Sequence, residues 1–167
     1  MELRLVKPNE LDQAMAIIND AKQHLADQGV DQWQTGYPDE GHIKADIDKK
    51  AAYFVTDGID LLGYVCADFS GEPAYEKLQG TWQTSDQYVV IHRLAFSEKA
   101  RGRGLSSTVF QLVEKLALAS GVTALRVDTD PENYKMQHII EKNGFSYRGR
   151  IWFDGGEKVA YDKVLTA

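Results

Sequence analysis

The spacing of apolar residues along the chain switches between a period of two and a period of three to four, and this predicts the order of strands and helices. Residues 3–7 alternate as in a half-buried strand. A helix is predicted between Pro8, which suits a helix start, and Gly29, which suits a helix end. A second, shorter helix is predicted over residues 42–50. The apolar face of the first helix consists of Leu11, Ala14, Met15, Ile18, Ala21 and Leu25.

The remainder of the chain mixes strands with helices. Strands over 51–56 and 61–69 flank Asp57-Gly58, which predicts a hairpin. Residues 72–80 fit either a loop or one helical turn. The other predicted elements are a strand over 88–96, a helix over 105–120, a strand over 124–129, a helix over 131–143, and strands over 145–153 and 157–165 around the turn at 154–156. This order predicts an α/β fold, with a mixed central sheet of about seven strands and helices on both faces.

Composition narrows the class of protein. A chain of 167 residues with 43% hydrophobic residues is expected to form a single domain over residues 1–167. A formal net charge of -6 argues against nucleic-acid and membrane-surface binding. Cys66 is the only cysteine, which excludes an internal disulfide, and it lies in an apolar stretch that predicts burial. The sequence has neither a signal-peptide pattern nor an apolar run of membrane-spanning length, so we expect a cytoplasmic protein.

The stretch "RGRGLSSTVF", residues 101–110, places two arginines and two glycines directly before a helix. A helix start presents unpaired N–H groups and the positive end of the dipole, and glycine lets a ligand approach the backbone closely. Arginine adds donors suited to phosphate oxygens. These features predict a pyrophosphate cradle, with a solvated basic loop as the alternative. The stretch matches neither the P-loop nor the dinucleotide-binding fingerprint.

Residues 101–106, "RGRGLS", resemble the coenzyme A loop of the GNAT superfamily of acetyltransferases, Arg/Gln-x-x-Gly-x-Gly/Ala, with Ser106 in place of the last small residue. Asn133 near the start of the next helix and Gly144-Phe145 at its end also match this family, as does the order of elements over the whole chain. The resemblance implies the GNAT fold, with the strands over 88–96 and 124–129, the fourth and fifth, splayed apart around acetyl-CoA. The cofactor contacts that it implies are with Leu94, Ala95, Phe96, Arg101, Gly102, Arg103, Gly104, Leu105, Ser106 and Asn133.

Acetyl transfer to an amine needs a group that takes a proton from the ammonium. His92, which interrupts an apolar strand, is one candidate catalytic residue; a structural histidine at the core edge is the alternative. Asp128, at the end of the neighbouring strand, is the second candidate, as base or as ligand of the amine, and a capping aspartate is the alternative. Ile140 occupies the position where many GNAT enzymes have a tyrosine acid, and Tyr134 is a substitute for it on the same helix or a surface residue.

The connector between the first two helices is rich in aromatic and amide side chains. Trp33 and Tyr37 are candidate substrate-binding residues there, unless they only anchor the connector. The excess of carboxylates between Asp27 and Asp48, with Asp46 among them, predicts a cationic or zwitterionic acceptor. The four histidines are scattered, and we expect no metal site.

The function that the resemblance implies is transfer of an acetyl group from acetyl-CoA to a primary amine of a small molecule or peptide, by direct attack in a ternary complex. One alternative is an acyl-CoA-binding module of the same fold with lost catalysis, which the isoleucine at position 140 favours. Another is a domain that binds a different nucleotide or phosphate in the same loop. A homodimer is left open by the sequence.

Overall fold

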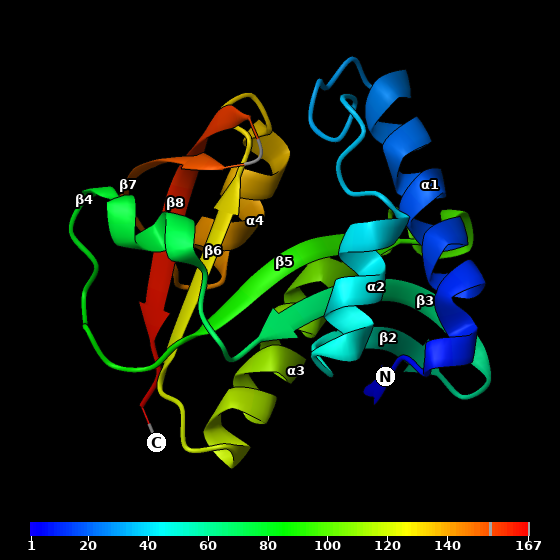
Figure 1. The fold of residues 1–167 in the computed structure, drawn as a ribbon, viewed down its shortest axis with the longest axis horizontal. Coiled ribbons are helices and arrows are strands. Elements are labelled where there is room, and N and C mark those ends of the chain that lie inside the picture. The colour runs from blue at the N-terminus through cyan, green and yellow to red at the C-terminus, as the bar shows by residue number, and fades with distance from the viewer. Residues whose placement is uncertain (154, 167) are drawn as a thin grey trace. The chain divides into compact units, whose positions relative to one another are not determined.

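The computed structural model describes residues 1–153 and 155–166. These residues gather into two compact units, each of which combines two stretches of the chain (Figure 1). Unit 1 comprises Met1–Asp68 and His92–Leu105, and unit 2 comprises Phe69–Ile91 and Ser106–Ala167. Strand β5 (Val89–Phe96) contributes its first three residues to unit 2 and the others to unit 1.

Unit 1 is an antiparallel sheet with two helices on one face. Strand β2 (Ala52–Asp57) pairs with β1 (Glu2–Leu5) and with β3 (Asp60–Asp68), and the turn between β2 and β3 confirms the predicted hairpin. Helices α1 (Leu11–Asp27) and α2 (Glu40–Asp48) bury their apolar sides against these strands. The shared core includes Ile17, Ile18, Ile43, Ile47, Phe54, Tyr64 and Ala95. Short 3₁₀ turns lie at Pro8–Glu10 and Glu98–Ala100.

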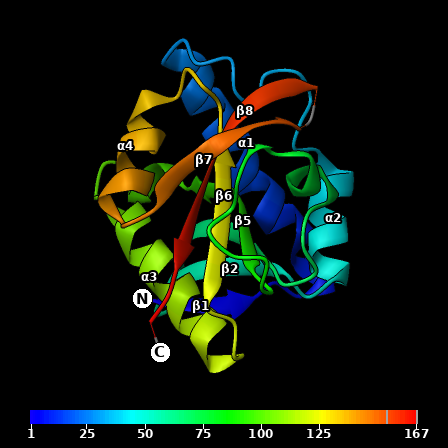
Figure 2. The same cartoon turned by 90° about the vertical axis from the view of Figure 1, so that its left-hand side faces the viewer.

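Unit 2 is built on a mixed sheet. The residues of β5 in this unit pair in parallel with β6 (Ala124–Thr129). Strand β8 (Gly156–Val164) pairs antiparallel with both β6 and β7 (Ser146–Phe153), and Figure 2 shows these three strands side by side. Of the turn predicted between β7 and β8, Asp154 lies outside the described residues.

Both faces of the unit 2 sheet are covered. Helices α3 (Leu105–Ala119) and α4 (Tyr134–Lys142) lie on one face, where Tyr161 of β8 contacts α4 and Lys163 contacts α3. The 3₁₀ turn η2 (Pro73–Lys77) and the chain after it lie on the other face, against a cluster of Tyr75, Val90, Ile151 and Ala160. Residues 72–80 therefore do contain the short helical turn that was one of the two possibilities.

An eighth strand, β4 (Gln79–Gly80), joins the edge of β7. Gly80 faces Gly149 there, and a Cβ on Gly80 would lie 1.9 Å from the Arg148 carbonyl oxygen. Only glycine allows this approach. In the described part of the chain the strand neighbours follow the order β1-β2-β3-β5-β6-β8-β7-β4, one strand more than predicted.

Candidate active site

The glycine-rich stretch forms the loop that joins β5 to α3. Gly102 and Gly104 both have a left-handed backbone, with φ of 75° and 69°, and both are exposed. A Cβ on either glycine would meet nothing within 4 Å, so the space beside this backbone is open. α3 begins at Leu105, directly after the loop. Open backbone at a helix start is suited to an anion, and these residues fit the phosphates of a nucleotide-like ligand.

The arginines of this loop differ in their surroundings. Arg101 is half-buried, and its Nη1 donates to the carbonyl oxygen of Phe96 at 3.2 Å. Arg103 is exposed to solvent. Arg101 therefore supports the end of β5 with one donor while its other donors remain suited to phosphate oxygens.

The end of β5 offers one side of its backbone for pairing. The N–H of Ser97 donates to Leu62 of β3 at 2.9 Å, and Ala95 packs its side chain into the unit 1 core. Because backbone groups alternate in direction along a strand, the N–H and C=O groups of Leu94 and Phe96 point away from β3. These are the groups predicted to pair with an extended ligand, and of them the Phe96 carbonyl oxygen already accepts the hydrogen bond from Arg101.

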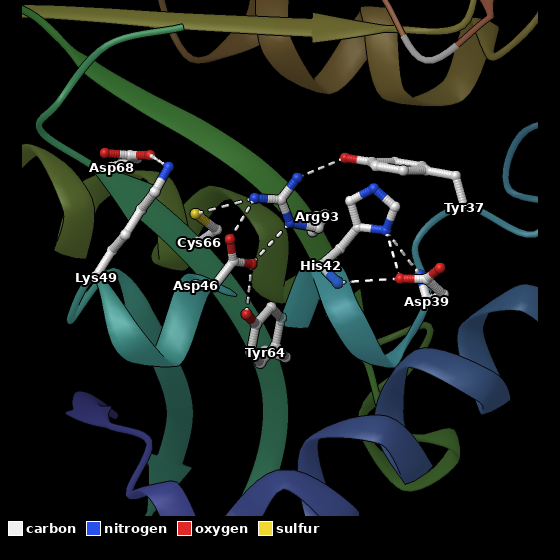
Figure 3. A network of polar contacts seen from close by, with 9 residues as sticks. All are labelled: Tyr37, Asp39, His42, Asp46, Lys49, Tyr64, Cys66, Asp68 and Arg93. Carbon is white, nitrogen blue, oxygen red and sulfur yellow. Dashed lines mark hydrogen bonds and ion pairs between the residues drawn. The ribbon is translucent and has the colours of Figure 1, made fainter. Parts of the chain in front are cut away.

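Arg93 is the functional candidate that the sequence pattern did not reveal (Figure 3). Its backbone is left-handed, with φ of 53°, although it lies inside strand β5. Its guanidinium holds Asp46 of α2 with two donors, Nε to Oδ2 at 2.7 Å and Nη2 to Oδ1 at 2.5 Å. The side chains of Arg93 and Asp46 are 9% and 4% exposed, so this is a buried ion pair.

Two further groups complete this pair. The phenol of Tyr64 donates to Asp46 Oδ2 at 2.7 Å, and Nη2 of Arg93 lies 3.5 Å from the sulfur of Cys66. Burial raises the pKa of both Tyr64 and Cys66, and the Asp46 carboxylate raises both further. Burial lowers the pKa of Arg93, but the hydrogen bond with Asp46 and the charge interactions with Cys66, Tyr37 and Asp46 together outweigh this, and the net shift is upward. The guanidinium therefore stays charged while the phenol and the thiol stay neutral.

Asp46 corrects one expectation from the sequence. It was counted among the exposed carboxylates that attract a cationic acceptor, but it is buried and neutralised by Arg93. Asp39 caps α2, and its Oδ1 lies 2.7 Å from Nδ1 of His42, so this carboxylate also has partners within the protein. The acidic surface of this segment is weaker than the count of carboxylates suggested.

Tyr37 and Trp33 lie in the α1–α2 loop, which we define as residues 28–39. Tyr37 is half-buried, accepts a hydrogen bond from Arg93 Nη1 at 2.6 Å and packs edge-on against His42. Trp33 packs against the core between α1 and the sheet, as expected of a residue that anchors the loop. Its ring is only partly buried, and its role toward a substrate stays a prediction.

The two predicted catalytic residues lie in different units. His92 is a buried residue of β5, 8% exposed, directly before Arg93 in unit 1. Asp128 is a half-buried residue of β6 in unit 2, and its Oδ2 accepts a hydrogen bond of 2.6 Å from Tyr75. Tyr75 is fully buried, and burial, followed by the Asp128 carboxylate, raises its pKa. Sequence reasoning missed Tyr75, which lies 53 residues from its partner.

Helix α4 begins after Asn133, whose Oδ1 accepts from the N–H of Met136 at 3.1 Å. Asn133 is therefore a helix cap, which leaves its predicted contact with a ligand a prediction. Ile140 is 0% exposed and belongs to the core, and Tyr134 is 74% exposed. Neither residue has surroundings typical of a catalytic acid.

Within residues 1–153 and 155–166, no group of three or more His, Cys, Asp and Glu side chains is placed to hold a metal ion. Among the helices described, none is both long and apolar enough to cross a membrane.

Comparison with known proteins gives a consistent result. A sequence model described as the Acetyltransferase (GNAT) family matches residues 18–145. A solved structure of a GNAT-family acetyltransferase from Streptococcus agalactiae 2603 has 35% sequence identity and a TM-score of 0.88, over 99% of this chain and 96% of that one. A search of curated proteins finds no match.

Two more distant structures share the fold. One is a GNAT-family acetyltransferase from Listeria monocytogenes 4b F2365, with 21% identity, a TM-score of 0.79 and coverage of 98% of this chain and 94% of that one. The other is the aminoglycoside acetyltransferase AAC(6')-Ib in complex with coenzyme A and kanamycin, with 18% identity, a TM-score of 0.70 and the same two coverages.

Proposed function

The chain belongs to the GNAT family of acetyltransferases and is an acyltransferase, and from this premise we propose that it transfers an acetyl group from acetyl-CoA to a primary amine of a small molecule or peptide. The amine attacks directly, with donor and acceptor bound together, and residues 1–167 act as one catalytic domain. The observation that carries the proposal is the open, left-handed loop of Gly102 and Gly104 at the start of α3.

Acetyl-CoA supplies the acetyl group as a thioester. The loop of residues 101–104, with Leu105 and Ser106, holds the pyrophosphate through backbone N–H groups and the two arginines. The backbone of Leu94 and Phe96 pairs with the pantetheine arm, which the direction of their N–H and C=O groups favours. The family resemblance adds Asn133 to these contacts.

His92 takes the proton that the acceptor ammonium must lose. It is the histidine of β5, and it lies two residues before Leu94, whose backbone is proposed to hold the donor. Asp128 binds the acceptor ammonium, and the buried phenol of Tyr75 fixes the direction of its carboxylate. Both roles rest on the place of these residues in the family fold.

The reaction proceeds without a dedicated acid for the leaving thiolate. Ile140 fills the place where many relatives have a tyrosine, and its side chain is part of the core. A thiol has a pKa of about 8.5, so its anion leaves readily near neutral pH. The isoleucine at position 140 also favours the alternative, a module that binds acyl-CoA but has lost catalysis.

The proposed acceptor is a primary amine, and its identity is not specified further. The neighbour solved with kanamycin is called an aminoglycoside acetyltransferase, but at 18% identity it shares the fold and does not select this acceptor. None of the roles proposed for these residues requires a second copy of the chain.

His92→Ala tests the proposed chemistry. If His92 is the base, the substitution lowers kcat by about 10²–10⁴-fold and leaves the Kd for CoA unchanged. A variant that folds, binds CoA and keeps full turnover removes His92 from the mechanism.

Asp128→Asn, in contrast, is expected to raise the acceptor KM more than it lowers kcat in steady-state kinetics.

A further inference from the structure

The network around Arg93 connects three parts of unit 1 that are far apart in the sequence (Figure 3). The guanidinium belongs to β5, it holds Asp46 on α2, and its Nη1 holds the phenol oxygen of Tyr37 at 2.6 Å. Tyr37 is 56 residues from Arg93 and lies near the end of the α1–α2 loop. Arg93 thus ties this loop to the sheet through a hydrogen bond, in addition to the packing of Trp33 against the core.

This arrangement is an inefficient way to stabilise a fold. Desolvation of a buried ion pair often cancels its Coulomb attraction, and apolar residues of similar volume commonly serve as well or better. A left-handed backbone at a residue other than glycine adds a cost of about 1–3 kcal/mol. Arg93 carries both costs, inside a strand that otherwise needs neither. Strained residues of this kind are concentrated at functional sites.

The position of Arg93 in the chain indicates which function it serves. It lies directly after His92, the proposed base, and directly before Leu94, whose backbone is proposed to hold the donor. Its side chain leaves this strand on the side of α2 and reaches the loop that carries Tyr37 and Trp33. The same residue is therefore in the donor strand and in contact with the proposed acceptor loop.

The contact with Tyr37 has the geometry of a positioning bond. The guanidinium is held on Asp46 by two parallel bonds, which fixes its plane and hence the direction of Nη1. Tyr64, from β3, in turn donates to Asp46 and restricts the carboxylate. Tyr37 is therefore held by a group that has little rotational freedom of its own.

We propose that Arg93 is a positioning residue that, through Tyr37, fastens the α1–α2 loop to β5 and so sets the geometry of the acceptor site. The proposal rests on the proposed function, because it assigns the acceptor to this loop. The contribution of Asp46 is indirect, since it orients Arg93 and does not touch the loop in these bonds. Loss of the link frees the loop, and the acceptor must then order it on binding.

Tyr37→Phe is the smallest change that breaks the link, because it keeps the ring and removes only the phenol oxygen. A hydrogen bond to a charged group corresponds to a change of about tenfold or more in affinity. We expect the acceptor KM to rise by about tenfold, the Kd for CoA to stay the same, and amide hydrogen exchange in residues 30–37 to become faster. Tyr147→Phe is the control, because it removes the phenol of an exposed tyrosine on β7 that takes no part in this network, and we expect slow loop exchange and an unchanged acceptor KM.

A second variant separates positioning from folding. Asp46→Leu combined with Arg93→Met replaces the ion pair by apolar residues of similar size, which is expected to keep the protein folded. We expect this variant to show fast loop exchange and the same rise in acceptor KM as Tyr37→Phe. Arg4→Met with Glu10→Leu is its control, because Arg4 and Glu10 form another two-bond pair of unit 1 that does not involve the loop.

Two results would overturn the proposal. The first is loop exchange that stays slow in Tyr37→Phe and in the Asp46–Arg93 double variant, which would show that the loop is not fastened by this link. The second is fast exchange with an unchanged acceptor KM, which would show that fastening does not matter for the acceptor. A wild-type protein that acetylates no amine would instead reject the proposed function, and the exchange data would still decide whether Arg93 fastens the loop.

Discussion

Tyr75 lies in a segment whose apolar spacing fits no single element, yet its phenol makes a short hydrogen bond with Asp128. Tyr75 is fully buried, and the acceptor of the bond is a half-buried carboxylate on a central strand of unit 2. A buried donor on one carboxylate oxygen fixes the plane of the group and leaves the second oxygen in a defined direction. Tyr75 therefore orients the Asp128 carboxylate, the group that we propose binds the acceptor ammonium.

Tyr75→Phe is expected to lower kcat/KM for the amine by about 10–100-fold, since a hydrogen bond to a charged group contributes about 1.5–3 kcal/mol. Steady-state kinetics with a fixed concentration of acetyl-CoA measure the loss. Tyr147→Phe, on an exposed tyrosine, is the control and is expected to have no effect. Full activity in a folded Tyr75→Phe protein would show that Asp128 needs no orientation or takes no part.

The buried thiol of Cys66 is expected to make the free energy of unfolding depend on pH. Burial, with a further contribution from Asp46, raises the pKa of its thiol in the folded protein, so the unfolded chain loses this proton first as pH rises. Stability contributed by the neutral thiol is therefore present below the unfolded pKa of about 8.5 and decreases above it. Between pH 7.5 and 9.5 the free energy of unfolding is expected to fall by about 1.4 kcal/mol more in the wild type than in Cys66→Ala. Equal slopes in denaturant titrations of the two proteins would contradict this.

The sequence indicated candidate functional residues most clearly where several of them lie in one short stretch. Arg101, Gly102 and Gly104 lie together, so a common role in phosphate binding could be predicted from the sequence. Arg93 and Asp46 are 47 residues apart, and nothing local distinguishes a strand arginine that turns inward from one that is solvated. The same limit produced the error at Asp46, which counts as surface charge until its partner is known.

At the scale of elements, the loop between β5 and α3 is the part of the chain that we propose binds acetyl-CoA. Its two glycines have backbone angles that other residues adopt only with strain, and the space where their side chains would lie is open. Such a loop keeps bare backbone for a ligand instead of filling the space. The consequence can be tested without changing any charge.

Gly104→Ala is expected to weaken CoA binding while it costs the fold only about 1 kcal/mol, the ordinary penalty of alanine in a left-handed conformation. Gly58→Ala is the matched control: Gly58 has φ of 62° in the β2–β3 turn and also has open space around it. Calorimetry should show reduced CoA affinity for Gly104→Ala alone, and thermal unfolding should show a similar loss of stability for both. Equal CoA affinity in the two variants would mean that the loop backbone is not the binding surface.

Most helices and strands could be predicted from the spacing of apolar residues and from the turn residues between them. Examples are the hairpin at Asp57-Gly58 and the helices that end two residues before Gly29, Gly121 and Gly144, because each combines a regular apolar spacing with a turn or stop residue. Strand β4 could not be predicted in this way. It has two residues, and its pairing depends on Gly80 facing Gly149, which are 69 positions apart.

At the scale of the whole molecule, the family membership and the element order agree over the length of the chain. What the family does not supply is the acceptor, since the aminoglycoside acetyltransferase solved with kanamycin is 18% identical and shares only the fold. The chain remains acidic, with a net charge of -6, but the buried carboxylate of Asp46 is neutralised by Arg93 and offers no site for a cation. The α1–α2 loop, fastened at Arg93, is therefore where selection of the acceptor is expected to occur.

The most direct test of the account is release of free thiol from acetyl-CoA by the wild-type protein in the presence of a panel of primary amines. We predict thiol release that depends on an amine, with the acetylated amine recovered in equal amount, and a strong reduction of both in His92→Ala. A protein that binds CoA in calorimetry but releases no thiol above background with any amine would contradict transferase activity and leave a CoA-binding module.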